Sequence, residues 1–388
     1  MGKYNFDELV ERRGSGCSKW SGPQDEIPMW IADMDFAAAP AIQAALQKCV
    51  DRRVFGYFDL PDEWADAYVS WWDRRHHFKM NRERLIFTTG IVPAISSAVR
   101  KLTYPAEKVL VQTPCYNIFF NSIYNNGRYI VENKLKYDGN DYTIDWELFE
   151  EQLADPQVTM MILCNPHNPV GRIWDRQTLA RIGELCKQHH VIVFSDEIHC
   201  DLTAPGQEYI PFASVSDTCR EISVTGIAPT KCFNIAGINT AAVYAENELL
   251  HHKMWRALNT DEVAEPNAFA VAATLAAFNE SEDWLEELRA YIWDNKAWLT
   301  EKIKAECPQI RMHSEPATYL MWLDCSAFTK DTKSFCKFLR SEYKLRLAAG
   351  EAYGLGGAGF IRWNLAAPRE RLEEAAERFI CAVRNYSE

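Results

Sequence analysis

The stretch Val191-Ile-Val-Phe-Ser195 is followed directly by Asp196-Glu197, so an apolar run of strand length ends in two carboxylates. Thr159-Met-Met-Ile-Leu-Cys164 has the same form and leads into Asn165-Pro-His-Asn-Pro-Val-Gly171. Short continuous apolar runs bounded by turn residues are typical of strands that are buried on both faces. The polar residues that follow each run therefore mark the ends of two buried strands.

The same pattern repeats along the chain from about residue 55 to residue 280. Further strands are predicted at 84–90, 108–112 and 221–225, and helices at 94–102 and 179–189. Strands that alternate with helices predict an α/β fold, with a mostly parallel sheet of the seven-stranded type between two layers of helices. Ligands bind at the carboxyl ends of the strands in such folds, so the polar residues there should converge on one crevice.

The two ends of the chain follow other patterns. Helical periodicity at 40–50, 282–306 and 370–385 and apolar strands at 319–324 and 359–364 predict a smaller α+β unit. The predicted organisation is an N-terminal arm with part of the small domain (1–50), a large domain (51–283) and a small C-terminal domain (284–388).

The composition excludes several classes of protein. The 388 residues carry a net charge of −12, which disfavours nucleic acid and anionic membranes as partners. No apolar run has the roughly 18 residues of a membrane span, and the first residues lack the apolar core of a secretory signal. The 12 cysteines form no CxxC pair, which favours reduced thiols and a cytoplasmic location.

Histidines and tryptophans receive structural interpretations. The pairs His76-His77 and His189-His190 are adjacent in sequence, and adjacent side chains do not converge on one metal ion. We expect them on the surfaces of helices, and we predict no metal site. Trp71-Trp72 and Trp322 stand among apolar neighbours and are expected to pack in the core.

Three polar residues carry the chemistry. Asp196 ends a buried strand, where a carboxylate costs several kcal/mol unless a cation, such as a protonated pyridine nitrogen, meets it. Lys231 also follows an apolar strand, and a partly desolvated lysine is a good Schiff-base nucleophile. The amide of Asn168 lies between two prolines, where it can bond a phenolic ring oxygen. Singly, such an Asp is commonly a helix cap and such a Lys is usually on the surface; together they favour a functional site.

These motifs resemble a known family. The ordered set of residues 165–171, Ser195-Asp-Glu-Ile-His199 and Lys231 is similar to the core of fold type I pyridoxal 5′-phosphate (PLP) enzymes of the class I/II aminotransferase superfamily. Within that superfamily the chain resembles the MalY/PatB group of cystathionine β-lyase-like C–S lyases, on the following segments: Met29-Trp-Ile-Ala-Asp-Met-Asp-Phe36, Phe55-Gly-Tyr57, residues 196–199 and Lys231-Cys-Phe-Asn-Ile-Ala-Gly237.

The resemblance implies a role for each candidate residue. Lys231 holds PLP as a Schiff base and moves the substrate's Cα proton, and Asp196 keeps the pyridine nitrogen protonated. The other cofactor-binding residues are Asn168 and His199 at the ring hydroxyl, Tyr116 on the ring face, the backbone of Gly90, Ile91 and Val92 with Thr230 at the phosphate, and Tyr57, which reaches the neighbouring subunit's cofactor. Arg362 clamps the substrate carboxylate. Asp33 is a further substrate-binding candidate, and Tyr319 is expected either to line the substrate pocket or to pack in the core.

Three positions depart from the wider superfamily. His199 stands where many aminotransferases carry a tyrosine, which agrees with the lyase group. Ala228 replaces a common phosphate-binding serine, and Asn239 replaces the usual arginine. With fewer charged donors, the phosphate is expected to rely on backbone amides, Tyr57 and Thr230.

The expected function is α,β-elimination on L-cystathionine or a related cysteine S-conjugate such as cystine or cysteine, which yields a thiol, pyruvate and ammonia. A homodimer is expected, because family members build each active site from two subunits. Two alternatives stay open: a class I/II aminotransferase, which shares every cofactor residue, and a PLP-fold protein that also holds a regulatory partner.

Overall fold

The central element of the fold is a seven-stranded sheet with the strand order β2-β10-β9-β8-β7-β3-β4. The computed structural model describes residues 2–313 and 315–387. The strands are β2 (Leu85–Thr88), β3 (Lys108–Thr113), β4 (Tyr129–Lys134), β7 (Val158–Cys164), β8 (Ile192–Asp196), β9 (Ser223–Ile227) and β10 (Ala241–Tyr244). Only β10 runs antiparallel to its neighbours, so the predicted mostly parallel sheet is confirmed.

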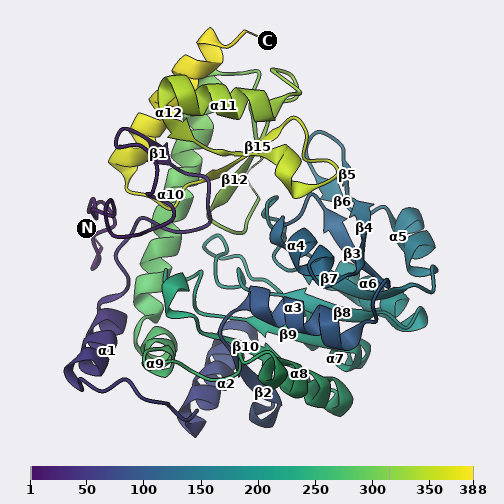
Figure 1. Cartoon of the computed structure of the whole chain (residues 1–388). Helices are drawn as coiled ribbons and strands as arrows, with labels where there is room; N and C mark the ends of the chain where they lie inside the picture. Colours follow the sequence, from purple (N-terminus) through teal and green to yellow (C-terminus); the bar gives the residue numbers. More distant parts are fainter. Residues whose placement is uncertain (1, 314, 388) are drawn as a thin grey trace.

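Both faces of this sheet are covered by helices, as Figure 1 shows. Val109 and Val111 of β3 pack with one layer, whereas Leu110 between them packs with the other, as the two-residue period of a strand requires. The first layer contains α3 (Ile91–Leu102), α4 (Ile118–Tyr124) and α8 (Glu248–Thr260). The second layer contains α5 (Trp146–Leu153), α6 (Arg176–Gln188) and α7 (Asp217–Ile222).

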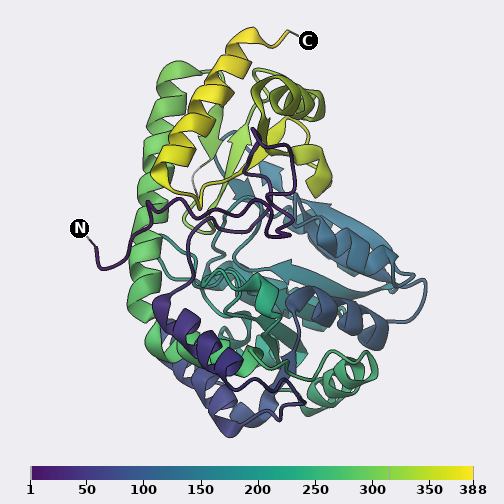
Figure 2. The same ribbon diagram turned by 60° about the vertical axis from the view of Figure 1, so that its left-hand side comes forward.

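A smaller antiparallel sheet, with the order β11-β12-β15-β14, lies at the top of Figure 1. Its strands are β11 (Arg311–His313), β12 (Leu320–Asp324), β15 (Phe360–Asn364) and β14 (Ala348–Ala349). They share a core with α11 (Thr332–Tyr343), α12 (Arg369–Asn385) and the end of α10 (Glu282–Glu306). The long α10 runs beside both the large and the small sheet in Figures 1 and 2, so it ties the two parts together.

The N-terminal segment also contacts both parts. Strand β1 (Ile27–Pro28) pairs with β13 (Leu345–Arg346), and α1 (Pro40–Asp51) packs on α9 (Ala270–Glu280). Figure 2 shows the residues between them crossing the molecule between the two sheets. Other elements are α2 (Asp62–His76), a small hairpin of β5 (Lys136–Tyr137) and β6 (Tyr142–Thr143), and short 3-10 helices at Arg82–Arg84, Phe212–Ser214, Ala236–Ile238 and Gly350–Tyr353. The domain limits at 50 and 283 stay a prediction.

Several further sequence predictions can be compared with the structure. Trp71, Trp72 and Trp322 are almost fully buried, as expected. All 12 cysteines are free thiols. Within residues 2–313 and 315–387, the helices are either too short or too polar to span a bilayer. Helix α3 begins at Ile91, three residues before the predicted start, which makes Gly90 its N-cap.

Candidate active site

The polar ends of the parallel strands meet at one edge of the large sheet. Asp196, the last residue of β8, lies in register between Cys164 of β7 and Gly226 of β9. Asn168 follows β7, and Lys231 follows β9 by four residues. Because these strands are parallel, their carboxyl ends share one edge of the sheet. The register therefore supports the predicted convergence of these residues on that edge.

Asp196 is a buried carboxylate without a matching cation. It is 5% exposed, and its carboxylate accepts a hydrogen bond from the Ile198 N–H at 3.2 Å. Burial raises the pKa of Asp196 to about 7, although the Ile198 N–H and the charge of Lys231 act in the opposite direction. A buried carboxylate with a raised pKa is suited to a ligand that brings a positive charge to it.

Lys231 lies on the first loop after β9. Its Nζ donates a hydrogen bond to the carbonyl oxygen of Ala32 at 2.6 Å. Burial lowers the pKa of Lys231 to about 8; the carboxylates of Asp33 and Asp196 oppose this shift, and Arg362 reinforces it. An amine with this pKa is partly neutral near neutral pH, as a nucleophile or a general base must be.

Arg362 comes from β15 of the small sheet and reaches the same site. Its guanidinium donates to Asn168 Oδ1 at 3.1 Å and to the carbonyl oxygen of Trp30 at 3.0 Å, and it lies 4.8 Å from the ring centroid of Tyr353. The arginine is 4% exposed, and its Nε has no hydrogen-bond partner among the described residues. The group is therefore held in place while one donor stays available to a ligand.

The arm residues 30–33 form one wall of the site through their backbone. Asn364 donates to the carbonyl oxygens of Ile31 and Asp33 at 2.7 and 2.8 Å, and the Trp30 and Ala32 carbonyls take Arg362 and Lys231. Sequence reasoning found this arm by its motif, but it missed the carbonyl contacts, since a backbone acceptor leaves no signal in residue identity.

Asp33 is a second carboxylate near Lys231. Its Oδ2 pairs with Arg12 at 2.7 Å, and the side chain is 25% exposed, so the group is accessible from solvent. Arg12 also pairs with the buried Asp35 at 2.8 Å, and Lys19 pairs with Asp35 at 2.9 Å. This ion-pair network, which sequence reasoning missed, fixes the arm beside the lysine.

His199 and Tyr319 form the deep side of the site. His199 is 3% exposed, its ring centroid lies 6.1 Å from that of Tyr319, and its Nδ1 has no partner among the described residues. Burial lowers the pKa of His199 to about 3, and the nearby charges of Lys231 and Arg362 lower it further, so the ring is neutral at physiological pH.

Tyr116 and the start of α3 each follow the end of a further strand of the large sheet. Tyr116 follows β3, and burial raises its pKa to about 12, with Arg362 and Asp196 close enough to affect it. Gly90 precedes α3, and no side chain caps this helix, so the N–H groups of its first turn are open to an anion. Thr230 is buried one residue before Lys231.

Two predicted residues differ from the rest. Tyr57 is 99% exposed in the extended stretch between α1 and α2, and within this chain it does not join the site. The surface prediction for His76 is wrong: its side chain is 5% exposed and its Nε2 lies 3.0 Å from Asp201 Oδ1. Two residues that are adjacent in sequence can differ in burial: His77, the neighbour of His76, is 74% exposed.

Several features of the site fit PLP. The uncompensated carboxylate matches a ring cation, and the open helix N-terminus matches a phosphate. The lysine with a lowered pKa matches an aldehyde. The buried nitrogens of His199 and Arg362 that have no partner among the described residues match further polar groups. Among the residues that the structure describes, the one group of side chains spaced to hold a metal ion is His76, Cys200 and Asp201.

Comparison with known proteins identifies the class. The chain matches the aminotransferase class I and II family model over residues 28–379, and it belongs to that family. It is 40% identical to the cystathionine beta-lyase PatB of Bacillus subtilis over 98% of this chain and 100% of PatB. It is 31% identical to the MalY protein of Escherichia coli over 98% of this chain and 99% of MalY.

A solved structure agrees with these relatives. Cystalysin from Treponema denticola, whose crystal structure contains a pyridoxal 5′-phosphate cofactor, superposes with a TM-score of 0.95 at 30% identity. The match covers 98% of this chain and 99% of cystalysin. The resemblance to the MalY/PatB group and the predicted fold are thus confirmed.

Proposed function

We propose that this protein is a PLP-dependent C–S lyase that cleaves the Cβ–S bond of L-cystathionine or a related cysteine S-conjugate. The relatives named cystathionine beta-lyase, and the cofactor in cystalysin, support the activity and the cofactor. The net reaction takes up water and yields a thiol, pyruvate and ammonia. Cystathionine, cystine and cysteine are the candidate substrates.

One observation carries the proposal: Asp196 and Lys231 lie at one sheet edge with their pKa values displaced toward each other, to about 7 and about 8. Burial causes both shifts, and neither group has a salt-bridge partner among the described residues. Such a pair is unfavourable unless a ligand occupies the site, and it suits an aldehyde that carries a basic ring nitrogen.

The cofactor-binding roles follow from the positions of the residues. Asp196 would pair with the ring nitrogen, Asn168 and the neutral His199 would face the ring hydroxyl, and Tyr116 would cover the ring. The first N–H groups of α3, at Gly90, Ile91 and Val92, would bind the phosphate with Thr230. When bound, PLP supplies an electron sink that stabilises negative charge at the substrate's Cα.

Three groups of the chain would act on the substrate. Arg362 would bind its α-carboxylate, which requires the guanidinium to exchange one of its present acceptors for the ligand. Lys231 would remove the Cα proton, and Asp196 would keep its own charge opposite the ring. Burial by Tyr319 and His199 would keep water from the reacting atoms.

Substrate side chains would extend toward Asp33. Its Oδ2 is held by Arg12, and its 25% exposure leaves the carboxylate accessible. Asp33 lies next to Ala32, whose carbonyl oxygen accepts from Lys231, so a substrate attached near the lysine would approach this carboxylate. Asp33 and Tyr319 are therefore proposed as substrate-pocket residues.

A homodimer is part of the proposal. Val54, Phe55 and Tyr57 are 71%, 56% and 99% exposed on one extended stretch, which a second copy would cover. Tyr57 would then reach the partner's cofactor. Full cofactor affinity in a Tyr57→Phe variant would contradict the role of Tyr57. A monomeric elution volume for the active wild type would contradict the homodimer. A cytoplasmic location, predicted from the cysteines, and the absence of a nucleic-acid partner, predicted from the acidic composition, stay predictions.

The function can be tested with purified holoenzyme and L-cystathionine or L-cystine, without any keto acid. Pyruvate should form in equal amounts with a free thiol from L-cystathionine, or with a persulfide from L-cystine, and Lys231→Ala should form none of these products. Release of a keto acid that retains the sulfur, with conversion of the cofactor to its amine form, would instead make the protein an aminotransferase.

A further inference from the structure

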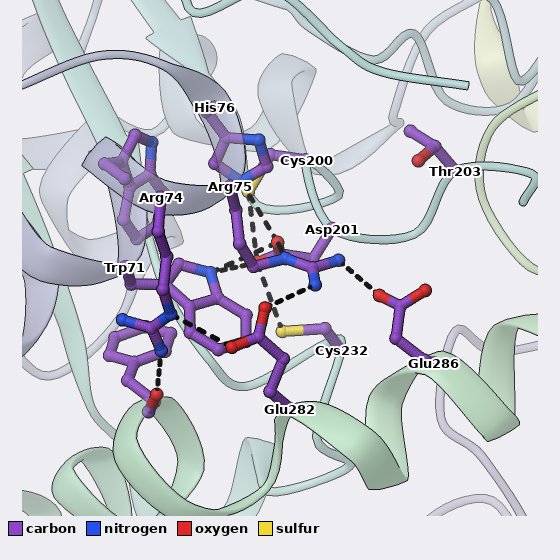
Figure 3. Close-up of polar contacts among 12 residues, drawn as sticks. Trp71, Arg74, Arg75, His76, Cys200, Asp201, Thr203, Cys232, Glu282 and Glu286 are labelled. Carbon is purple, nitrogen blue, oxygen red and sulfur yellow. Dashed lines mark hydrogen bonds and ion pairs between the residues drawn. The ribbon is translucent and has the colours of Figure 1, made fainter. Parts of the chain in front are cut away.

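Asp201 is a buried carboxylate that collects hydrogen bonds from helix α2 (Figure 3). Its side chain is 1% exposed. Trp71 Nε1 donates to both carboxylate oxygens, at 3.1 and 3.0 Å, and Arg75 Nε lies 3.3 Å and His76 Nε2 3.0 Å from Oδ1. All three partners lie on α2 within six residues, so one helix supplies these contacts to Asp201.

The second oxygen of Asp201 faces two thiols. Cys200 Sγ lies 3.7 Å and Cys232 Sγ 3.8 Å from Oδ2. Burial raises the pKa of both cysteines well above the usual range, so each stays protonated and has one S–H to donate. Cys232 Sγ also lies 3.4 Å from the Pro229 carbonyl oxygen, which shares this one proton with Asp201. Cys200 directly follows His199, and Cys232 directly follows Lys231. One carboxylate oxygen therefore contacts both active-site segments.

Asp201 is ionised despite its burial. Burial acts to raise the pKa of Asp201, but His76, Arg75 and the Trp71 N–H together hold it well below its usual range. Arg75 is itself fixed by Glu282 at 2.9 Å and Glu286 at 2.7 Å on α10, as Figure 3 shows. The acceptor is thus a full negative charge on a rigid framework, which strengthens the bonds that it accepts.

A metal site is the competing interpretation of this cluster. The ligand atoms of His76, Cys200 and Asp201 lie within 4.8 Å of one another. However, Arg75 and Trp71 already donate to the carboxylate, and a guanidinium 3.3 Å from Oδ1 repels a second cation. The geometry favours hydrogen bonds over metal ligation.

We propose that Asp201 is a positioning residue, which acts through the thiols of Cys200 and Cys232 to fix the His199 and Lys231 segments relative to each other and to α2. The proposal rests on the proposed function, in which His199 and Lys231 hold the cofactor. Asp201 itself contacts neither substrate nor cofactor.

The test measures the cofactor without any substrate, in the holoenzyme. The visible absorption band of Lys231-bound PLP is titrated against pH, and the PLP dissociation constant is measured for Cys200→Ala, Cys232→Ala, Cys232→Ser and Asp201→Asn. Cys325→Ala is the matched control, because Cys325 is an equally buried thiol whose Sγ contacts the Leu323 carbonyl in the small sheet. Loss of a buried thiol as such affects all the alanine variants alike.

The expected result separates positioning from stability. Cys232→Ala should shift the titration midpoint by about half a pH unit and weaken PLP binding about three- to tenfold, because a donor to a charged acceptor is lost. Cys232→Ser should restore most of both values, since a hydroxyl also donates. Cys325→Ala should leave the midpoint unchanged.

A comparison of Asp201→Asn in two backgrounds provides the second part of the test. If Asp201 acts through the thiols, Asp201→Asn should shift the midpoint much less in the Cys200→Ala/Cys232→Ala background than in the wild type. An equal shift in both backgrounds, or a Cys232→Ala midpoint equal to that of the Cys325→Ala control, would overturn the proposal. If Asp201→Asn does not fold, the cysteine variants decide alone. Because no substrate is used, a failure of the lyase proposal leaves this measurement valid.

Discussion

Two buried aspartates, five residues apart on the same segment, have opposite surroundings. Asp196 has one N–H donor and a pKa raised to about 7, whereas Asp201 has donors from α2 and two thiols and a pKa held well below its usual range. Burial opposes ionisation at both positions, so the partners make the difference. An uncompensated buried carboxylate indicates a ligand site, and a fully compensated one indicates a structural role.

The largest expected effect comes from removing the charge at the ligand site. Asp196→Asn in the holoenzyme should lower kcat/KM for L-cystathionine by about 10³-fold, because a neutral amide cannot keep the ring nitrogen protonated. The apoprotein should at the same time be at least as stable as the wild type to urea at pH 8, since an uncompensated charge is removed. A large loss of apoprotein stability would show that Asp196 is compensated within the chain.

The opposite result is expected for the structural aspartate. Asp201→Asn should destabilise the apoprotein by roughly 3–5 kcal/mol, because Trp71, Arg75 and His76 lose their shared charged acceptor. Urea unfolding of the apoprotein at pH 7 measures this loss of stability. Asp324→Asn, a substitution at another buried aspartate, serves as the comparison. A loss below about 1 kcal/mol, the value for an exposed pair, would make the two aspartates alike.

The smallest effect is the pH dependence that Asp196 imposes on the apoprotein. Its folded pKa of about 7 exceeds the unfolded value of 3.8, so between those values the folded state binds more protons and stability falls as the pH rises. Glu197, with a pKa raised to about 7 by burial, contributes in the same direction.

A comparison of two apoproteins isolates the contribution of Asp196. In Asp196→Asn the fall in unfolding free energy between pH 5 and 6.5 should be shallower by about 1.4 kcal/mol per pH unit, and the buried histidines cancel because both proteins contain them. Parallel stability curves for the two apoproteins would mean that Asp196 titrates normally.

The sequence predicted most of the sheet and the residues at its edge. Apolar runs such as 159–164 and 191–195 are buried on both faces, and this pattern is visible in residue identity. Strands β4 and β10 and several helices, α9 among them, were not predicted from the sequence. The short apolar run of β10 and the alanine-rich stretch of α9 carry little periodic signal.

The candidate site was predicted only in part. Lys231, Asp196 and Asn168 follow strands in the chain, whereas Arg12 and the carbonyls of residues 30–33 reach the site through tertiary contacts that no local pattern reports. His76 was misinterpreted for the same reason, since its partner Asp201 lies 125 residues away.

Lys231, opposite Asp196, is the residue proposed to hold the cofactor. The chain contains a rival amine, Lys296 on α10, whose pKa burial lowers to about 7 and whose Nζ contacts the Ala317 carbonyl oxygen at 3.2 Å. The most direct measurement is borohydride reduction of the holoenzyme, followed by peptide mapping by mass spectrometry. The reduced cofactor is expected on the peptide that contains Lys231; a cofactor on the Lys296 peptide, or on neither peptide, would overturn the assignment of Lys231.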